Sequence, residues 1–155
     1  MIIGPILQGG LKMIAEEEKD WEVLKCIRKD ATGDLSRRLS SLMDDDSMWD
    51  EIVAPELTEL FSDQVNFVDE KIMEAWRKSE DSSEEEGEIV ILKEEADMWY
   101  GALNQARLSM EARYRLGPRE EREIEEVSDE EVKSAHYREE FYVTVQSLLM
   151  QYAMD

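Results

Sequence analysis

The polar residues best suited to chemistry lie along one predicted helix. Tyr100, Asn104, Arg107 and Glu111 follow one another at intervals of four, three and four residues. Because this spacing matches the helical repeat, their side chains form a stripe, here called the polar stripe, beside the apolar face of the helix. An arginine offers five donors to a carboxylate or to a group of carbonyls. With Arg113 as a flanking cation, the polar stripe is a candidate site for a ligand, a peptide end or a protein partner.

The same stripe has a structural interpretation. Asn and Arg at the border of a core are costly unless they are hydrogen-bonded. Arg107 could therefore pair with an acid of the last predicted helix, while Asn104 ties down a loop. The exposure and the partners of Arg107 distinguish the two hypotheses.

The usual catalytic and metal-binding patterns are missing from the sequence. Cys26 and His136 are the only residues of their types, and no Gly-x-Ser-x-Gly elbow occurs. A di-iron helix needs Glu three residues before His, where Lys133 stands. A calcium loop that begins at Asp44 would need Glu where Pro55 stands. We therefore expect no cofactor and no metal, and the sequence favours a non-enzymatic role.

The charge restricts the partners. Thirty-nine acidic and eighteen basic residues among 155 give a net charge of −21. This charge disfavours direct binding to nucleic acid and to anionic membranes, and it favours a basic protein partner. No apolar run is long enough for a membrane span, and no signal peptide is recognisable, so we expect a cytoplasmic protein. The sequence leaves a homo-oligomer open.

A small β element is predicted at the N-terminal end. Two apolar stretches within 2–14 flank Gly9 and Gly10, which tolerate positive φ, so they form an antiparallel hairpin. Pro5 lacks an amide hydrogen, so the first strand should lie at an edge or be bulged. The β-branched run 88–92 is predicted as a third strand, with the start of a helix as the alternative.

Helical periodicity predicts that the rest of the chain forms a mainly α bundle of about five helices. One helix starts in the acidic run 16–18 and ends near 32–34, and a short helix is predicted within 35–43. Apolar residues at helical spacing continue through 48–61, where Pro55 starts or kinks a helix, and Ser62 or Asp63 caps a further helix to about 78. The most clearly periodic helix spans about 93–116, with Trp99 on its buried face, and a capping box at 128–131 begins the last helix.

We interpret the whole chain, 1–155, as a single domain. The segment 79–88 is acidic and nearly free of apolar residues, so we expect a mobile loop there. It does not divide the chain, because neither half has a complete core.

The segment from Trp99 to Leu108 reads WYGALNQARL. It resembles the W-x-x-A-L-N-x-x-R-L signature of an uncharacterised bacterial family, a domain of unknown function best known from actinobacteria. The stretch 141–148 is similar to the closing helix of that family. The resemblance implies a mainly helical fold and the bacterial cytoplasm, and it implies no established activity. Genes of the family often lie beside that of the Clp protease adaptor, which suggests a link to regulated proteolysis.

The leading hypothesis is a non-enzymatic protein-interaction or regulatory module that uses its acidic surface and the polar stripe. One alternative is a small-ligand binder or enzyme with a pocket around Tyr100, Asn104, Arg107 and Glu111. Another is an acidic mimic of nucleic acid that occupies a basic DNA-binding protein.

Overall fold

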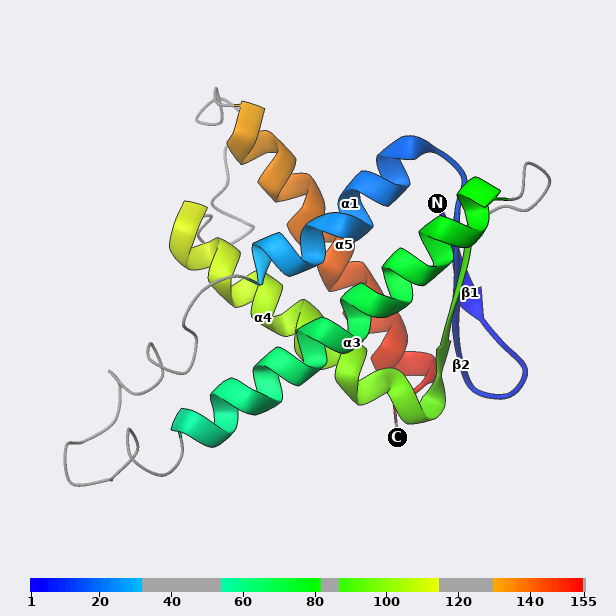
Figure 1. Ribbon diagram of the computed structural model, residues 1–155, viewed down its shortest axis with the longest axis horizontal. Coiled ribbons are helices and arrows are strands. Elements are labelled where there is room, and N and C mark those ends of the chain that lie inside the picture. The colour runs from blue at the N-terminus through cyan, green and yellow to red at the C-terminus, as the bar shows by residue number, and fades with distance from the viewer. Residues whose placement is uncertain (32–53, 82–86, 115–129, 155) are drawn as a thin grey trace.

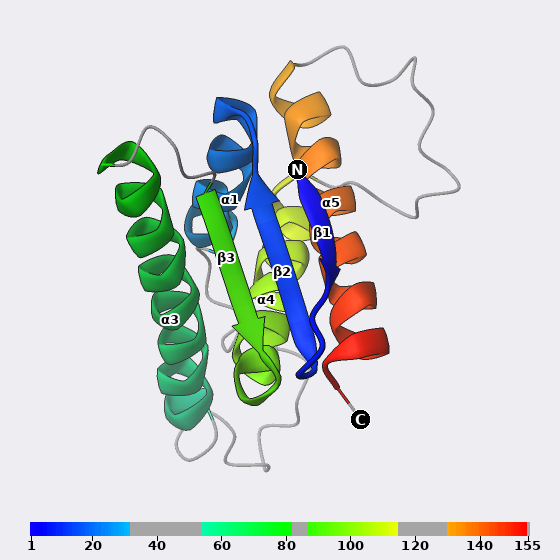
Figure 2. The same ribbon diagram turned by 90° about the vertical axis from the view of Figure 1, so that its right-hand side faces the viewer.

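The computed structural model describes residues 1–31, 54–81, 87–114 and 130–154. In this part of the chain, helices pack against one face of a small antiparallel sheet (Figures 1 and 2). The elements are, in chain order, β1 (Ile2–Pro5), β2 (Gly10–Ala15), α1 (Glu18–Asp30), α3 (Ala54–Asp81), β3 (Gly87–Leu92), the 3₁₀ turn η3 (Lys93–Glu95), α4 (Ala96–Tyr114) and α5 (Glu130–Tyr152).

The sheet has the strand order β1-β2-β3, and both pairings are antiparallel. This confirms the predicted hairpin and the third strand. Gly9 and Gly10 have φ angles of 83° and 126°, which glycine adopts without strain. A Cβ on Gly10 would lie 2.2 Å from the carbonyl oxygen of Ile91, so β3 can approach only a glycine there. Pro5 lies in the edge strand, where its missing N–H is tolerated, as expected.

Side chains of the sheet alternate between two different environments. On β2 and β3 the inward residues are buried; they are Leu11, Met13, Ala15, Ile89 and Ile91. The helices α1, α4 and α5 lie on this side of the sheet, and α3 runs alongside β3 (Figure 2). The outward residues are exposed or half-buried; they are Ile2, Lys12, Ile14, Glu88, Val90 and Leu92.

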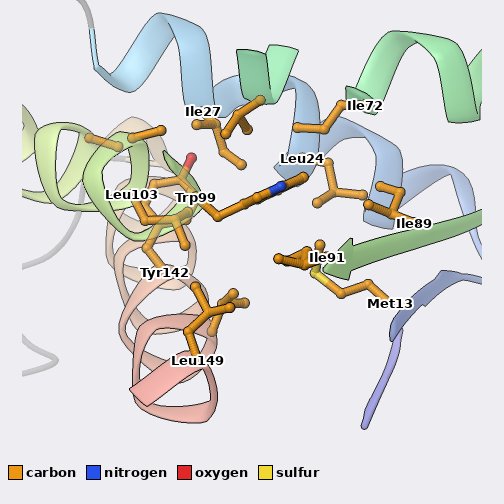
Figure 3. Packing of buried hydrophobic residues seen from close by; sticks show 14 of the residues in the cluster. Met13, Leu24, Ile27, Ile72, Ile89, Ile91, Trp99, Leu103, Tyr142 and Leu149 are labelled. Carbon is orange, nitrogen blue, oxygen red and sulfur yellow. The ribbon is translucent and has the colours of Figure 1, made fainter. Parts of the chain in front are cut away.

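Trp99 of α4 lies at the centre of the core. Its side chain is 1% exposed, and its ring lies among Leu24, Ile72 and Ile91 (Figure 3). The predicted apolar face of α4 is therefore the buried one. These three residues belong to α1, α3 and β3, so the indole packs against all three elements. This packing fixes the orientation of α4 and of the polar residues beside its apolar face.

The helix α3 is longer than predicted. It runs without interruption from Ala54 to Asp81, so the predicted boundary at Ser62 or Asp63 is wrong. Apolar residues continue at helical spacing through that point, and these are Leu57, Phe61, Val65, Val68 and Ile72. A capping residue inside such a pattern does not end the helix, because the continuous apolar face keeps packing on α1 and α4.

The structure also revises the other predicted boundaries. Residues 79–81 of the predicted acidic loop belong to α3, and 87–88 belong to β3, while the rest of that loop lies outside the described residues. Four α-helices are described, against the expected five or so. The predicted short helix in 35–43, the start of the pattern at 48 and the cap at Ser128 lie outside the described ranges. Within these ranges, none of the helices has the length and apolar character of a membrane span.

Candidate functional site

The helix α4 carries the whole polar stripe and packs against α5. Tyr100, Asn104 and Arg107 are half-buried, and Glu111 and Arg113 are exposed. The inner three residues therefore lie at the border of the core, as their spacing predicts.

Arg107 is held by two side chains of α5. Its Nη1 donates a hydrogen bond of 2.6 Å to Oε1 of Gln146, and its Nε lies 3.9 Å from Oε1 of Glu139. Gln146 in turn donates from Nε2 to the carbonyl oxygen of Tyr100, at 3.3 Å. Gln146 and Glu139 are both buried. Arg107 thus connects α4 to an acid of the last helix, as the structural interpretation expected.

One donor of the Arg107 guanidinium nevertheless has no hydrogen-bond partner among the described residues. The side chain of Arg107 is 35% exposed. Its Nε is buried and, among the described residues, has no hydrogen-bond partner, because 3.9 Å is too long for a hydrogen bond to Glu139. An unsatisfied buried donor costs about 1–3 kcal/mol. A carboxylate or carbonyl oxygen of a partner could reach only the exposed part of the guanidinium and not the buried Nε.

Arg113 does not extend the stripe. Six residues separate it from Arg107, which corresponds to about 120° around the helix. Its guanidinium lies 5.8 Å from the ring centroid of Tyr114, within the range of a cation–π contact. Glu111 is exposed on the last turns of α4. Glu111 and Arg113 are therefore the exposed members of the candidate set.

A buried charged network, which the sequence did not predict, joins α1 to α5. Asp30 is fully buried and accepts hydrogen bonds from Nε of Arg138 at 2.7 Å and from Nη2 at 3.0 Å. The hydroxyl of Tyr142 donates to the same carboxylate at 2.5 Å. Nη1 of Arg138 donates to Oγ of Ser134 at 2.7 Å. The Asp30 network, as we call these four residues, fixes the end of α1 on α5.

The electrostatics of the Asp30 network keep Arg138 charged and Tyr142 neutral. Burial lowers the pKa of Arg138, but the hydrogen bonds and the charge of Asp30 more than offset this and raise it. Burial, together with the negative charge of Asp30, also raises the pKa of Tyr142. Cys26 is half-buried, and burial raises the pKa of its thiol, which disfavours the reactive thiolate.

One sequence signal could have indicated the Asp30 network. Asp30 is the last residue of α1, where a carboxylate opposes the helix dipole and needs a compensating partner. On α5, Ser134, Arg138 and Tyr142 follow at intervals of four residues and therefore share one face. Nothing local connects the two segments, since Asp30 and Arg138 are 108 residues apart.

A second polar contact holds α4 against α3. Gln105 is buried, and its Nε2 donates to Oε1 of Gln64 at 2.9 Å and to the carbonyl oxygen of Phe61 at 3.1 Å. Gly101 allows this approach, because a Cβ there would lie 2.4 Å from the carboxamide of Gln64. Neither Gln64 nor Gln105 is predicted from the sequence, because a single glutamine gives no indication of the residue to which its side chain will hydrogen-bond.

The described residues hold no cluster of three or more His, Cys, Asp or Glu side chains that could bind a metal ion. His136 is half-buried on α5. The fold thus brings Arg107 to Gln146 and Glu139 of α5, and it assembles the Asp30 network between α1 and α5.

Comparison with known proteins gives one match. No curated protein and no solved structure is significantly similar to the chain. The model of a domain of unknown function, DUF2017, matches residues 27–153, from the last turn of α1 to just past the end of α5. This match covers more than half of the sequence, and the chain therefore belongs to the DUF2017 family.

Proposed function

We propose that this chain is a non-enzymatic protein-interaction module with a basic protein partner. In this proposal Arg107 provides a specific contact to a carboxylate or carbonyl group of the partner. The observation that supports it is the state of the guanidinium, which α5 holds in place while a third of the side chain remains exposed. A cation that is already oriented loses less conformational entropy on binding than a free one.

The net charge of −21 supports the choice of partner. Such a charge accelerates the encounter with a basic protein and repels phosphate backbones. It contributes orientation and rate more than affinity, so a local contact such as that of Arg107 is needed for specificity.

The experiment compares Arg107→Met with Arg113→Met. Both substitutions remove one positive charge from α4, but the first removes the side chain whose Nη1 donates to Gln146 of α5. Partners captured by the wild-type protein are identified, and the affinity of each isolated partner is then measured by titration. We expect Arg107→Met to weaken binding at least about tenfold, the effect of about 1.4 kcal/mol, and Arg113→Met to change it little.

Two measurements make the result decisive. Circular dichroism and the Tm establish that both variants are folded, because Arg107→Met also removes the hydrogen bond to Gln146. Equal affinities of the two variants for every partner would show that Arg107 serves the fold alone. Binding that does not weaken with salt would contradict the basic character of the partner.

The other hypotheses remain predictions that the same purified protein can test. A pocket for a small ligand around the polar stripe predicts a higher Tm with small carboxylates such as succinate or a dipeptide. A nucleic-acid mimic predicts that the captured partner is a DNA-binding protein and that duplex DNA displaces this chain. The segment 99–108 resembles the W-x-x-A-L-N-x-x-R-L signature of the bacterial family described above. This resemblance adds the expectation of a bacterial cytoplasmic protein with a link to regulated proteolysis.

A further inference from the structure

The outer face of the sheet carries a group of apolar side chains. Ile2 and Leu92 are 52% and 40% exposed, and Ile14 and Val90 are half-buried between them. Ile2 is paired with Ile14 across the β1–β2 ladder, which places the two side by side. The described helices that pack on the sheet lie behind it in Figure 2, so this outer face is open in the described part of the chain. These four residues are called the outer apolar face.

Both edges of the sheet are protected, whereas the face is not. The strand β1 has only four residues and ends at Pro5, which cannot donate to an added strand. On the opposite side, α3 packs alongside β3 (Figure 2). An added β-strand is therefore a poor occupant, and an element that lies across the face is a better one.

The size of the face matches one helix and not a second copy of this chain. Three strands about 4.8 Å apart, with up to six residues each, form a face of about 14 Å by 20 Å. A helix with its side chains is about 10–12 Å wide. Two such faces in contact would bury far less than the about 800 Å² per partner of a stable dimer. They would also bring together two chains with a net charge of −21 each.

The charges around the face complete the description of the occupant. At its centre, Lys12 and Glu88 form an ion pair of 3.2 Å and largely neutralise each other. At the end of β2, the exposed carboxylates Glu16, Glu17 and Glu18 follow directly. Glu16 is partly compensated by the N-terminal ammonium group of Met1, which lies 3.3 Å from its Oε1 and 3.2 Å from Oδ2 of Asp20. The three carboxylates still outnumber this one cation, so an approaching segment would meet apolar side chains beside a net negative charge.

We propose that the outer apolar face binds a basic amphipathic helix of a partner protein. Its apolar side chains would cover Ile2, Ile14, Val90 and Leu92, and its Lys or Arg side chains would reach the carboxylates at 16–18. The contact area is small, which is typical of a transient complex. This inference rests on the proposed interaction role, but it does not involve Arg107.

The test uses a synthetic peptide of about 14 residues, the length that spans about 20 Å, with Leu and Lys placed for an amphipathic helix. A scrambled peptide of the same composition measures the contribution of charge alone. The first protein variant combines Ile2→Thr, Ile14→Thr, Val90→Thr and Leu92→Thr, which keeps β-favouring residues and the net charge. The matched variant combines Leu60→Gln, Tyr137→Gln and Met150→Gln, exposed apolar residues on helices.

Fluorescence anisotropy should show that wild-type protein binds the amphipathic peptide at least about tenfold more tightly than the scrambled one. The threonine variant should lose at least about tenfold in affinity through lost apolar burial, and the glutamine variant should bind like wild type. Equal binding of both peptides, or equal binding by wild type and the threonine variant, would overturn the proposal.

Two further measurements separate this inference from others. Arg107→Met should bind the peptide like wild type, so the failure of the Arg107 contact and the failure of the outer apolar face are distinguishable. Sedimentation of the protein alone should give a monomer. A dimer that the threonine variant abolishes would assign the face to self-association and refute the helix as its occupant.

Discussion

The Asp30 network gives the most quantitative prediction. In Arg138→Met the cation is lost, while Asp30 stays fully buried and keeps only the hydroxyl of Tyr142. Removing one partner of a buried ion pair costs about 3–5 kcal/mol, because the remaining charge is uncompensated. Two charge-assisted hydrogen bonds to Asp30 and one to Ser134 disappear together, so we expect about 4 kcal/mol. That is a large part of the about 5–15 kcal/mol that stabilise a typical domain.

The assays are urea unfolding, which gives the free energy of unfolding, and thermal unfolding, which gives the Tm, both followed by circular dichroism and tryptophan fluorescence. A protein of this size loses about 2–4 °C in Tm for each kcal/mol, so the Tm should fall by about 10 °C or more. Lys133→Met on the same helix is the control, since Lys133 is half exposed and its contact with Glu130 is a surface ion pair at 3.6 Å. Its expected cost is below about 1 kcal/mol.

The double variant Asp30→Asn with Arg138→Met tests the reasoning itself. It removes both charges. The hydroxyl of Tyr142 can then donate to the oxygen of the side-chain amide that the substitution places at position 30. We expect a coupling energy of about 2 kcal/mol or more between the two substitutions, so the double variant should be far more stable than the sum of single effects implies. Strict additivity, or a cost of Arg138→Met no larger than that of Lys133→Met, would refute the view that this charge pair is enclosed.

Three further predictions concern close packing and acid. Gly87→Ala should cost about 1–3 kcal/mol in urea unfolding, because the new Cβ would lie 2.0 Å from the buried ring of Trp21. Gly101→Ala should stay within about 1 kcal/mol of wild type, since the carboxamide of Gln64 can move and alanine gains about 1 kcal/mol in helix propensity; a large loss would contradict this. Burial raises the pKa of Asp20, but hydrogen bonds from backbone N–H groups that precede α1 outweigh this and lower it. Its stabilisation is therefore present above the ordinary pKa of 3.8 and is lost as the pH falls through the lowered value, and Asp20→Asn should remove this acid dependence.

The sequence predicted the elements that have local signals. Gly9 and Gly10 marked the hairpin, Pro5 marked the edge strand, and the periodic apolar residues around Trp99 marked the buried face of α4. Each of these signals acts within a few residues, so one sequence is sufficient to recognise it. The capping signal at Ser62 gives a wrong boundary, because a capping residue does not end a helix whose apolar face continues on both sides of it.

The polar contacts between helices were predictable only in part. The spacing of Arg107 placed it at the border of the core, and an acid on the last helix was expected as its partner. The residue that holds it by a hydrogen bond is Gln146, which carries no charge and gives no signal of its own. The pairing of Asp30 with Arg138 depends on how α1 and α5 meet, which only the assembled fold determines.

Asp30 and Arg138 are far apart in the sequence, so the two residues are synthesised at different times. After Asp30 has been added to the chain, 108 further residues must follow, the last of them Arg138, before the guanidinium that compensates its carboxylate exists. The central strand β2 likewise lacks its second neighbour until β3 has been synthesised, and β3 follows α3 in the chain. Nascent chains therefore expose an unfinished sheet until Leu92 has been added and an unmatched carboxylate until Arg138 has been added, and this interval is when chaperones would be needed most.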